Sequence, residues 1–121
     1  MKVSTIISSV PTLEKIDTTS LKLSTAYKIS KILVETKAIV ADYEKRRIAL
    51  ASEHGTLSED GTHYTFDDES MHVFNKGMEA IHNDEIELGI KKIHLSELDD
   101  TVTLSPAEIP SVEWFIEGFE D

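Results

Sequence analysis

One uninterrupted run dominates this sequence: residues 21–54 read LKLSTAYKISKILVETKAIVADYEKRRIALASEH, without proline or glycine. Apolar side chains recur in it at steps of three and four residues, which places them on one face of an α-helix. This row consists of Ala26, Ile29, Leu33, Thr36, Val40, Tyr43 and Leu50. We therefore predict one amphipathic helix of about thirty residues, roughly 45 Å long. A second apolar row, Ile32 and Ile39, lies beside the first, so more than one partner element should cover the helix.

A second helix is predicted between Asp67 and Asn83, and Asp67 is suited to cap its first turn. Its apolar side chains fall three or four residues apart and form a narrow seam: Met71, Phe74, Met78 and Ile81. Asp60 and Gly61 precede this helix and are typical of the turn of a β-hairpin, here over residues 57–66. We expect the second helix to lie antiparallel against the long one.

The remaining segments are predicted to supply a small sheet and a closing helix. Alternating apolar residues favour a strand over residues 85–95, a short strand over 101–104 that pairs back on it, and a weaker strand over 1–7. Ser105, Pro106 and Glu108 satisfy the rules for a helix start. That helix would bury Ile109, Val112, Phe115 and Ile116. A short helix should also begin at Ser8 or Ser9 and run to about Ile16.

The whole chain is thus predicted to be an α+β protein with a single domain over residues 1–121. The long N-terminal helix packs antiparallel on the second helix, the small sheet is mainly antiparallel, and a C-terminal helix closes the chain. The length of 121 residues, of which 40% are hydrophobic, suits one folded core. No apolar run approaches the ~20 residues of a membrane helix, so we expect no membrane. The lack of cysteine excludes disulfides and zinc–thiolate sites.

The charge is divided unevenly along the chain. Residues 1–50 hold nine basic and five acidic side chains, net +4, whereas residues 51–121 hold three basic and eighteen acidic ones, net −15. One interpretation is that two solvated faces attract each other within one fold. The other is that an acidic surface competes with nucleic acid for a basic protein. Direct nucleic-acid binding is not expected, since only Tyr27 and Tyr43 accompany the densest basic cluster, at Lys45 to Arg47.

The candidate partner-binding positions are acidic residues of the second half together with one tryptophan. An exposed aromatic side chain at Trp114 would indicate an interface, although a tryptophan there is more often part of a core. The full set is Asp67, Asp68, Glu69, Asp99, Asp100, Trp114, Glu117 and Glu120.

Candidate catalytic and metal-binding patterns are weak. Glu69 with His72, and Glu79 with His82, have the spacing of di-iron ligands. Both pairs lie on one predicted helix about 15 Å apart, so they cannot share a metal. Residues 56–67 have a glycine at the sixth of twelve places, but Thr56 and Ser58 stand where a calcium loop has carboxylates, and Asp67 is too short to replace its closing glutamate. No phosphate-binding loop or serine nucleophile motif is present. We expect no enzyme, no metal and no cofactor.

Several segments together resemble a family of small proteins encoded by tailed bacteriophages and prophages, to which no activity is assigned. The resemblance runs through most of the chain and rests on the order and spacing of the segments. They are Leu21 to Lys31, Tyr43 to Arg47 followed by Leu50, Asp60-Gly61, Glu87 to Leu98, and Leu104-Ser105 with Trp114-Phe115-Ile116. The resemblance implies a phage origin and a small α+β protein, with no catalytic residues to carry over.

Two functions follow as expectations from that resemblance and from the charge pattern. The first is a non-enzymatic phage protein that acts through protein–protein contacts, as a minor virion component or assembly factor. The second is an acidic anti-defence or host-takeover inhibitor that occupies a nucleic-acid-binding site of a host protein. The partner would be a phage virion protein or a host factor, and a homo-oligomer is a further alternative. The expected location is the host cell cytoplasm or the virion.

Overall fold

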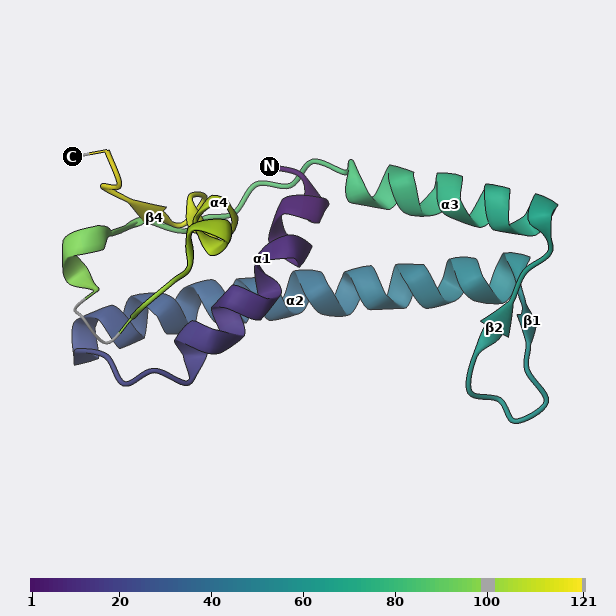
Figure 1. The fold of residues 1–121 in the computed structure, drawn as a ribbon, viewed down its shortest axis with the longest axis horizontal. Coiled ribbons are helices and arrows are strands. Elements are labelled where there is room, and N and C mark those ends of the chain that lie inside the picture. The colour runs from purple at the N-terminus through teal and green to yellow at the C-terminus, as the bar shows by residue number, and fades with distance from the viewer. Residues whose placement is uncertain (99–101, 121) are drawn as a thin grey trace. The chain divides into compact units, whose positions relative to one another are not determined.

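The computed structural model describes residues 1–98 and 102–120, and these form an α+β fold. Most of the described residues lie in helices, and the strands are short (Figure 1). In chain order the elements are α1 (Val3–Asp17), α2 (Leu23–His54), β1 (Thr56–Leu57), β2 (Tyr64–Thr65), α3 (Asp68–His82), β3 (Ile93–His94), a 3₁₀ turn (Leu95–Glu97), a second 3₁₀ turn (Pro106–Glu108), α4 (Ile109–Val112) and β4 (Ile116–Glu117).

The chain divides into two compact units. The first unit consists of Met1–Ser4 with Ala38–Ile86, and the second unit consists of Thr5–Lys37 with Glu87–Asp121. Helix α2 therefore contributes its C-terminal half to the first unit and its N-terminal half to the second. The expectation of a single domain stays a prediction, and we describe each unit by itself.

The first unit is built on the predicted antiparallel helix pair. Helix α3 runs back along residues 38–54 of α2 (Figure 1). Met78 and Ile81 of α3 are buried, as is Ala51 of α2. Gly77 permits a close approach of the helices, because a Cβ atom there would lie 2.8 Å from a Leu50 methyl carbon. The small residue thus lets the apolar seam of α3 reach the surface of α2.

Asp67 caps α3 as the sequence predicts. Its Oδ1 atom accepts a hydrogen bond of 2.7 Å from the backbone N–H of Ser70, and the Ser70 hydroxyl accepts one of 3.0 Å from the Asp67 N–H. The hydrogen bond from the Ser70 backbone N–H to this carboxylate, followed by interaction with the Ser70 side chain, holds the pKa of Asp67 below its ordinary value. The predicted hairpin also forms, because β1 and β2 pair antiparallel and Gly61 takes a positive φ of 73° in the turn between them.

The second unit holds a dense apolar core. Ile93 of β3 lies opposite Ile116 of β4 in a parallel pair, and the Ile93 N–H donates a hydrogen bond of 2.8 Å to the Phe115 carbonyl. Helices α1 and α2, together with Val112 of α4 and Phe115, supply the other side chains that pack around this pair. The buried members of the core are Leu13, Ile16, Ile29, Ile32, Ile93, Val112, Phe115 and Ile116.

The predicted strand over residues 1–7 is wrong, because the chain is helical from Val3. Val3 and Ile6 are both buried, and Ser9, Leu13 and Ile16 continue that face at helical spacing. Burial on one side of a helix therefore overrides the weak alternation of the first residues. Only Lys2 keeps a strand-like contact, an isolated antiparallel bridge to Glu85.

The predicted strands of the second half are also shorter than expected. Of residues 85–95, only Ile93–His94 forms a strand, and Glu85 forms the isolated bridge to Lys2. Residues 102–104 lie in no strand, and residue 101 is outside the described residues. The pair β3–β4 is parallel, whereas the hairpin is antiparallel.

The closing helix is much shorter than predicted. It begins at the expected position, Pro106, but with a 3₁₀ turn, and it ends at Val112 before Ile116 enters β4. Val112, Phe115 and Ile116 are buried as expected, although Ile109 is only half-buried. Pairing of the Ile116 backbone with β3 replaces the last helical turn, and Gly118 follows with a positive φ of 99°.

Candidate protein-binding groove

Three large apolar side chains of α2 in the second unit are exposed to solvent. Leu23 is 88% exposed, Tyr27 61% and Val34 66%. At about 100° per residue they fall within about 40° of one another around the helix, roughly opposite the buried Ile29 and Ile32. We call these three residues the apolar row. A helix that buries one face and exposes a second apolar row presents a surface suited to a partner.

Tyr27 and Val34 of the apolar row line a groove of about 700 Å³. Residues of the N-terminal half of α2 form one wall, and Gly89, Ile90 and Lys91 form the other. We call it the α2 groove. Its lining residues are Ser24, Tyr27, Lys28, Ser30, Lys31, Ile32, Val34, Glu35, Gly89, Ile90 and Lys91. The groove thus combines apolar side chains with lysines.

Two of these lysines make contacts within the second unit. Lys28 forms an ion pair with Glu97, and this ammonium, together with the His94 backbone N–H, holds the pKa of Glu97 below its ordinary value. The Lys31 Nζ atom lies 4.8 Å from the centre of the Tyr27 ring, which is a cation–π contact. Lys31 thereby also covers part of the exposed tyrosine.

Glu35 contributes the most unusual polar atom of the α2 groove. Its Oε2 atom is buried and has no hydrogen-bond partner among the residues that the structure describes. A hydrogen bond from a donor lowers the free energy of a buried oxygen that has no other partner. The groove can therefore offer an acceptor to a hydrogen-bond donor of a bound partner.

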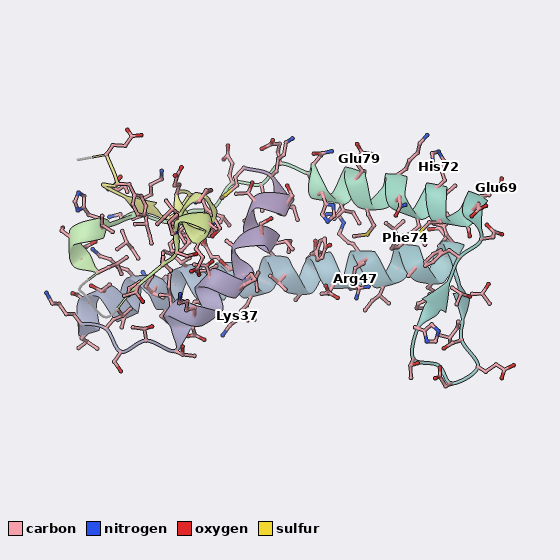
Figure 2. The ribbon with its side chains drawn as sticks, viewed as in Figure 1. Lys37, Arg47, Glu69, His72, Phe74 and Glu79 are labelled. Carbon is pink, nitrogen blue, oxygen red and sulfur yellow. The ribbon has the colours of Figure 1, made fainter. Side chains whose placement is uncertain are left out.

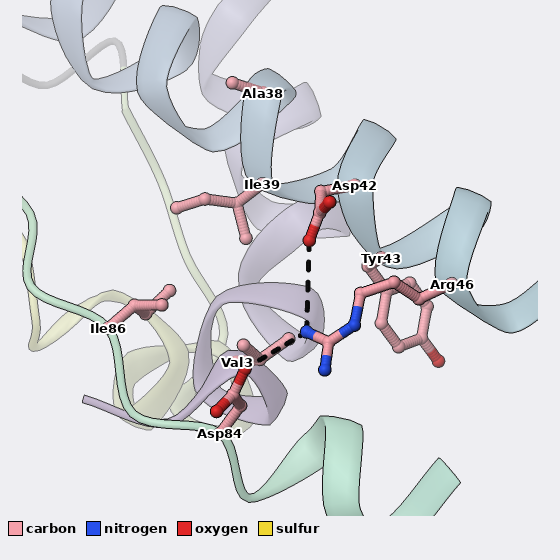
Figure 3. A pocket seen from close by; sticks show the side chains of 8 residues that line it. All are labelled: Val3, Ala38, Ile39, Asp42, Tyr43, Arg46, Asp84 and Ile86. Atoms are coloured by element: carbon pink, nitrogen blue, oxygen red, sulfur yellow. Dashed lines mark hydrogen bonds and ion pairs between the residues drawn. The ribbon is translucent and has the colours of Figure 1, made fainter. Parts of the chain in front are cut away.

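A second pocket, of about 290 Å³, lies within the first unit (Figure 3). Val3, Ile39 and Ile86 form apolar walls. The Arg46 Nη1 atom lies 3.1 Å from an oxygen of Asp84 and 3.9 Å from an oxygen of Asp42 (Figure 3). Because two carboxylates flank this guanidinium, it ties α2 to the chain after α3 rather than offering a free anion site.

Ion pairs inside each unit join the basic first half of the sequence to its acidic second half. Arg46 contacts Asp84 in the first unit. In the second unit, the Lys15 Nζ atom lies 3.2 Å from an oxygen of Glu108, and Lys28 contacts Glu97. These pairs support the interpretation that the two charge blocks attract each other within the fold.

The predicted partner-binding residues fall into separate groups. Asp67, Asp68 and Glu69 lie at the start of α3 in the first unit, whereas Trp114, Glu117 and Glu120 lie around β4 in the second. Asp99 and Asp100 lie outside the described residues.

Within these groups, three side chains have specific surroundings. The Asp67 carboxylate is occupied by the α3 cap. Trp114 is half-buried, and its ring lies edge-on to Phe115 at 4.8 Å between centres. Glu117 is exposed and pairs through its backbone with His94. Trp114 therefore belongs largely to the core region, while Glu117 faces solvent.

The candidate metal-binding residues lie on different sides of α3, because His82 contacts Tyr43 of α2. Figure 2 shows His72 and Glu79 on the side of α3 away from α2, whereas Phe74 points toward α2. No group of three potential metal ligands occurs within residues 1–98 and 102–120. In the hairpin, Asp60 Oδ1 accepts hydrogen bonds from the Ser58 and Thr62 hydroxyls at 2.5 and 2.8 Å, so the turn itself uses this carboxylate.

Sequence reasoning missed the α2 groove. The signal that could have located it is the helical position of Leu23, Tyr27 and Val34, which share one side of the helix apart from the row of Ile29 and Leu33. No comparable pattern indicates the wall formed by Gly89–Lys91, because the alternation of residues 85–95 predicts a paired strand there.

Comparison of the chain with models of known protein families, with curated proteins and with solved structures finds no match. Within the described residues, no helix has both the length and the apolar character needed to cross a membrane.

Proposed function

We propose that this chain is a non-enzymatic bacteriophage protein that acts through protein–protein contacts, as a minor virion component or assembly factor. The observation that carries the proposal is the exposure of Leu23, Tyr27 and Val34 on one side of α2, where Tyr27 and Val34 also line the α2 groove. Large apolar side chains exposed together are typical of surfaces that a partner covers. The phage setting comes from the resemblance described above.

The chemistry of the α2 groove supports a protein as its occupant. Ile32, Val34 and Ile90 offer apolar contact, and Tyr27 adds an aromatic ring of the kind enriched in protein interfaces. The unpartnered oxygen of Glu35 would accept a hydrogen bond from the partner. A protein partner can supply an apolar side chain and a donor within one short segment.

The first experiment replaces Leu23, Tyr27 and Val34 together by serine. These side chains are exposed, so we expect folding to be retained. The matched control replaces Ile48 and Val73, which are exposed in the first unit, by serine. Both variants and the natural protein are produced during infection, and their copy number in purified virions and assembly intermediates is measured by quantitative mass spectrometry.

We expect the natural protein and the control variant to copurify with virions or assembly intermediates, and the triple variant to be depleted at least about tenfold. Absence of the natural protein from particles and from every morphogenesis complex would overturn the proposal. Equal incorporation of the triple variant would show that the apolar row is not the contact surface.

The second candidate function is an acidic inhibitor of a host nucleic-acid-binding protein. It is favoured by the first turn of α3, where the side chains of Asp68 and Glu69 are exposed and form no ion pair with any described residue. Binding of this kind would weaken steeply as salt is added, because exposed charges are screened. Binding to a host partner that is insensitive to salt would exclude it.

A further inference from the structure

Residues 87–92 form an unpaired segment between two β-type contacts. Glu85, just before it, makes the bridge to Lys2, and Ile93, just after it, begins β3. Within the described part of the chain, no backbone hydrogen bond joins residues 87–92 to any other residue. The segment therefore leaves a row of free N–H and C=O groups, which is the template on which another strand can pair.

The side chains of this segment alternate as they do in a strand. Glu87, Gly89 and Lys91 are exposed, whereas Leu88 and Ile90 are half-buried. A Cβ atom on Gly89 would meet no atom within 4 Å, so the space beside this residue is open. Gly89 also has no positive φ, which agrees with an extended conformation. A glycine with open space around it marks a place where a second backbone can approach closely.

We infer that two copies of this chain form a symmetric dimer through antiparallel pairing of residues 87–91 with the same residues of the second copy. In the register centred on Gly89, each Glu87 lies opposite Lys91 of the second copy, and each Leu88 lies opposite Ile90 of the second copy. Residues directly opposite in an antiparallel pair interact most strongly, and opposite charges there are favourable. Residues 87–91 of one copy therefore complement the same residues of the second copy in charge and in apolar character.

The charge pattern is the reason for assigning a second copy as the occupant. A two-fold interface must match its own surface, and Glu87 and Lys91 do so at equal distances from Gly89. Neither side chain forms an ion pair with any residue that the structure describes. Two such cross-strand pairs also oppose the repulsion expected between chains that each carry a net charge of −11.

The apolar side of residues 87–91 gives the added strand a surface to cover, because Leu88 and Ile90 are only half-buried. A strand added along residues 87–91 brings Leu88 of the second copy beside Ile90, on the half-buried side of the segment. The inference goes beyond the proposed function because it requires no phage or host partner.

The test reverses the charge at position 87 or at position 91. Sedimentation at micromolar to millimolar protein concentrations then measures the dissociation constant of the dimer. Variant E87K places lysines opposite lysines in its own dimer, and K91E places glutamates opposite glutamates. We expect each variant alone to dimerise at least about tenfold more weakly than the natural protein. An equimolar mixture of the two variants restores both opposite-charge pairs, so we expect it to dimerise as the natural protein does. Circular dichroism checks that each variant is folded.

The matched control is K92E, which changes the net charge by the same amount as K91E but lies opposite Ile86 in the proposed register. We expect the dissociation constant of the K92E dimer to stay within about threefold of that of the natural protein. Three results would overturn the inference: a natural protein that remains monomeric at millimolar concentration, a dimer that neither E87K nor K91E weakens, or a mixture that dimerises no better than the separate variants.

Discussion

Tyr43 of α2 and His82 of α3 meet in two ways at once. The tyrosine hydroxyl and the histidine Nε2 atom share a hydrogen bond of 2.9 Å, and the two rings stack with their centres 5.5 Å apart. Both side chains are half-buried, and their contact lies at the last residue of α3. The pair therefore fixes how α3 lies along α2 within the first unit.

Replacing Tyr43 by phenylalanine should remove the hydrogen bond and keep most of the ring contact. We expect Y43F to lower the free energy of unfolding by about 1 kcal/mol, the usual net value of such a bond. Urea denaturation followed by circular dichroism measures the change. Y27F is the control, because Tyr27 is exposed and its hydroxyl forms no described hydrogen bond. A Y43F variant as stable as Y27F would show that the hydrogen bond does not stabilise the helix pair.

Gly118 should tolerate no side chain. Its φ is +99°, and a Cβ atom there would lie 2.7 Å from the His94 Nε2 atom. We expect G118A to destabilise the protein by about 1–3 kcal/mol, because a residue with a Cβ is strained in this backbone region. E113A is the control, because Glu113 is exposed and forms no described ion pair. Thermal unfolding distinguishes them, and equal melting temperatures would contradict the described path of the chain after β4.

Acid should weaken the second unit through two ion-paired carboxylates. Hydrogen bonds from Lys28 and the His94 N–H lower the pKa of Glu97 below its ordinary value of 4.5, and those from the Ser105 N–H and Lys15 lower the pKa of Glu108. A carboxyl with a lowered pKa stabilises the folded state where it is ionised. This stabilisation is therefore present above about pH 4.5 and is lost as the pH falls through the lowered values.

The measurement is the melting temperature of the natural protein and of the E97Q/E108Q variant between neutral pH and pH 3 or so. We expect the variant to be less stable near neutral pH and to lose less stability on acidification. The matched control is E14Q, because Glu14 is exposed and forms no described ion pair. If the melting temperatures of the natural protein and of E97Q/E108Q fell in parallel with pH, the two ion pairs would not contribute to the acid sensitivity.

Parts of the fold were predictable because local signals and tertiary packing agree. Residues 21–54 contain no helix breaker, and the observed α2 begins two residues later and ends at the same histidine. The same agreement holds for the Asp67 cap and for the hairpin turn at Gly61. Each of these features depends on a few neighbouring residues, which the sequence displays directly.

The remaining elements depend on contacts between distant segments. The first residues become helical because Val3 and Ile6 are buried on one face, which alternation alone does not reveal. Ile116 leaves the predicted helix because its backbone pairs with Ile93, more than twenty residues earlier. Residues 87–92 alternate like a strand but find no partner within the described chain. Local pattern cannot specify which distant backbone is available for pairing.

The candidate site was hidden for a related reason. The sequence shows that α2 has apolar residues on several sides, but only the packed structure shows which side stays uncovered. The core takes Ile29 and Ile32, and Leu23, Tyr27 and Val34 are left exposed. The acidic positions singled out from charge are instead divided between the two units, with Asp67 in use as a helix cap.

Site-specific photo-cross-linking in infected cells tests most directly the proposed contact between the apolar row and a virion or assembly protein. A photoreactive amino acid replaces Tyr27 in one variant and the exposed Thr65 of the hairpin in a control variant. We predict that position 27 cross-links to a virion or assembly protein and that position 65 does not. Cross-links from position 27 to no such protein, in cells where the variant is folded and particles form, would contradict the account.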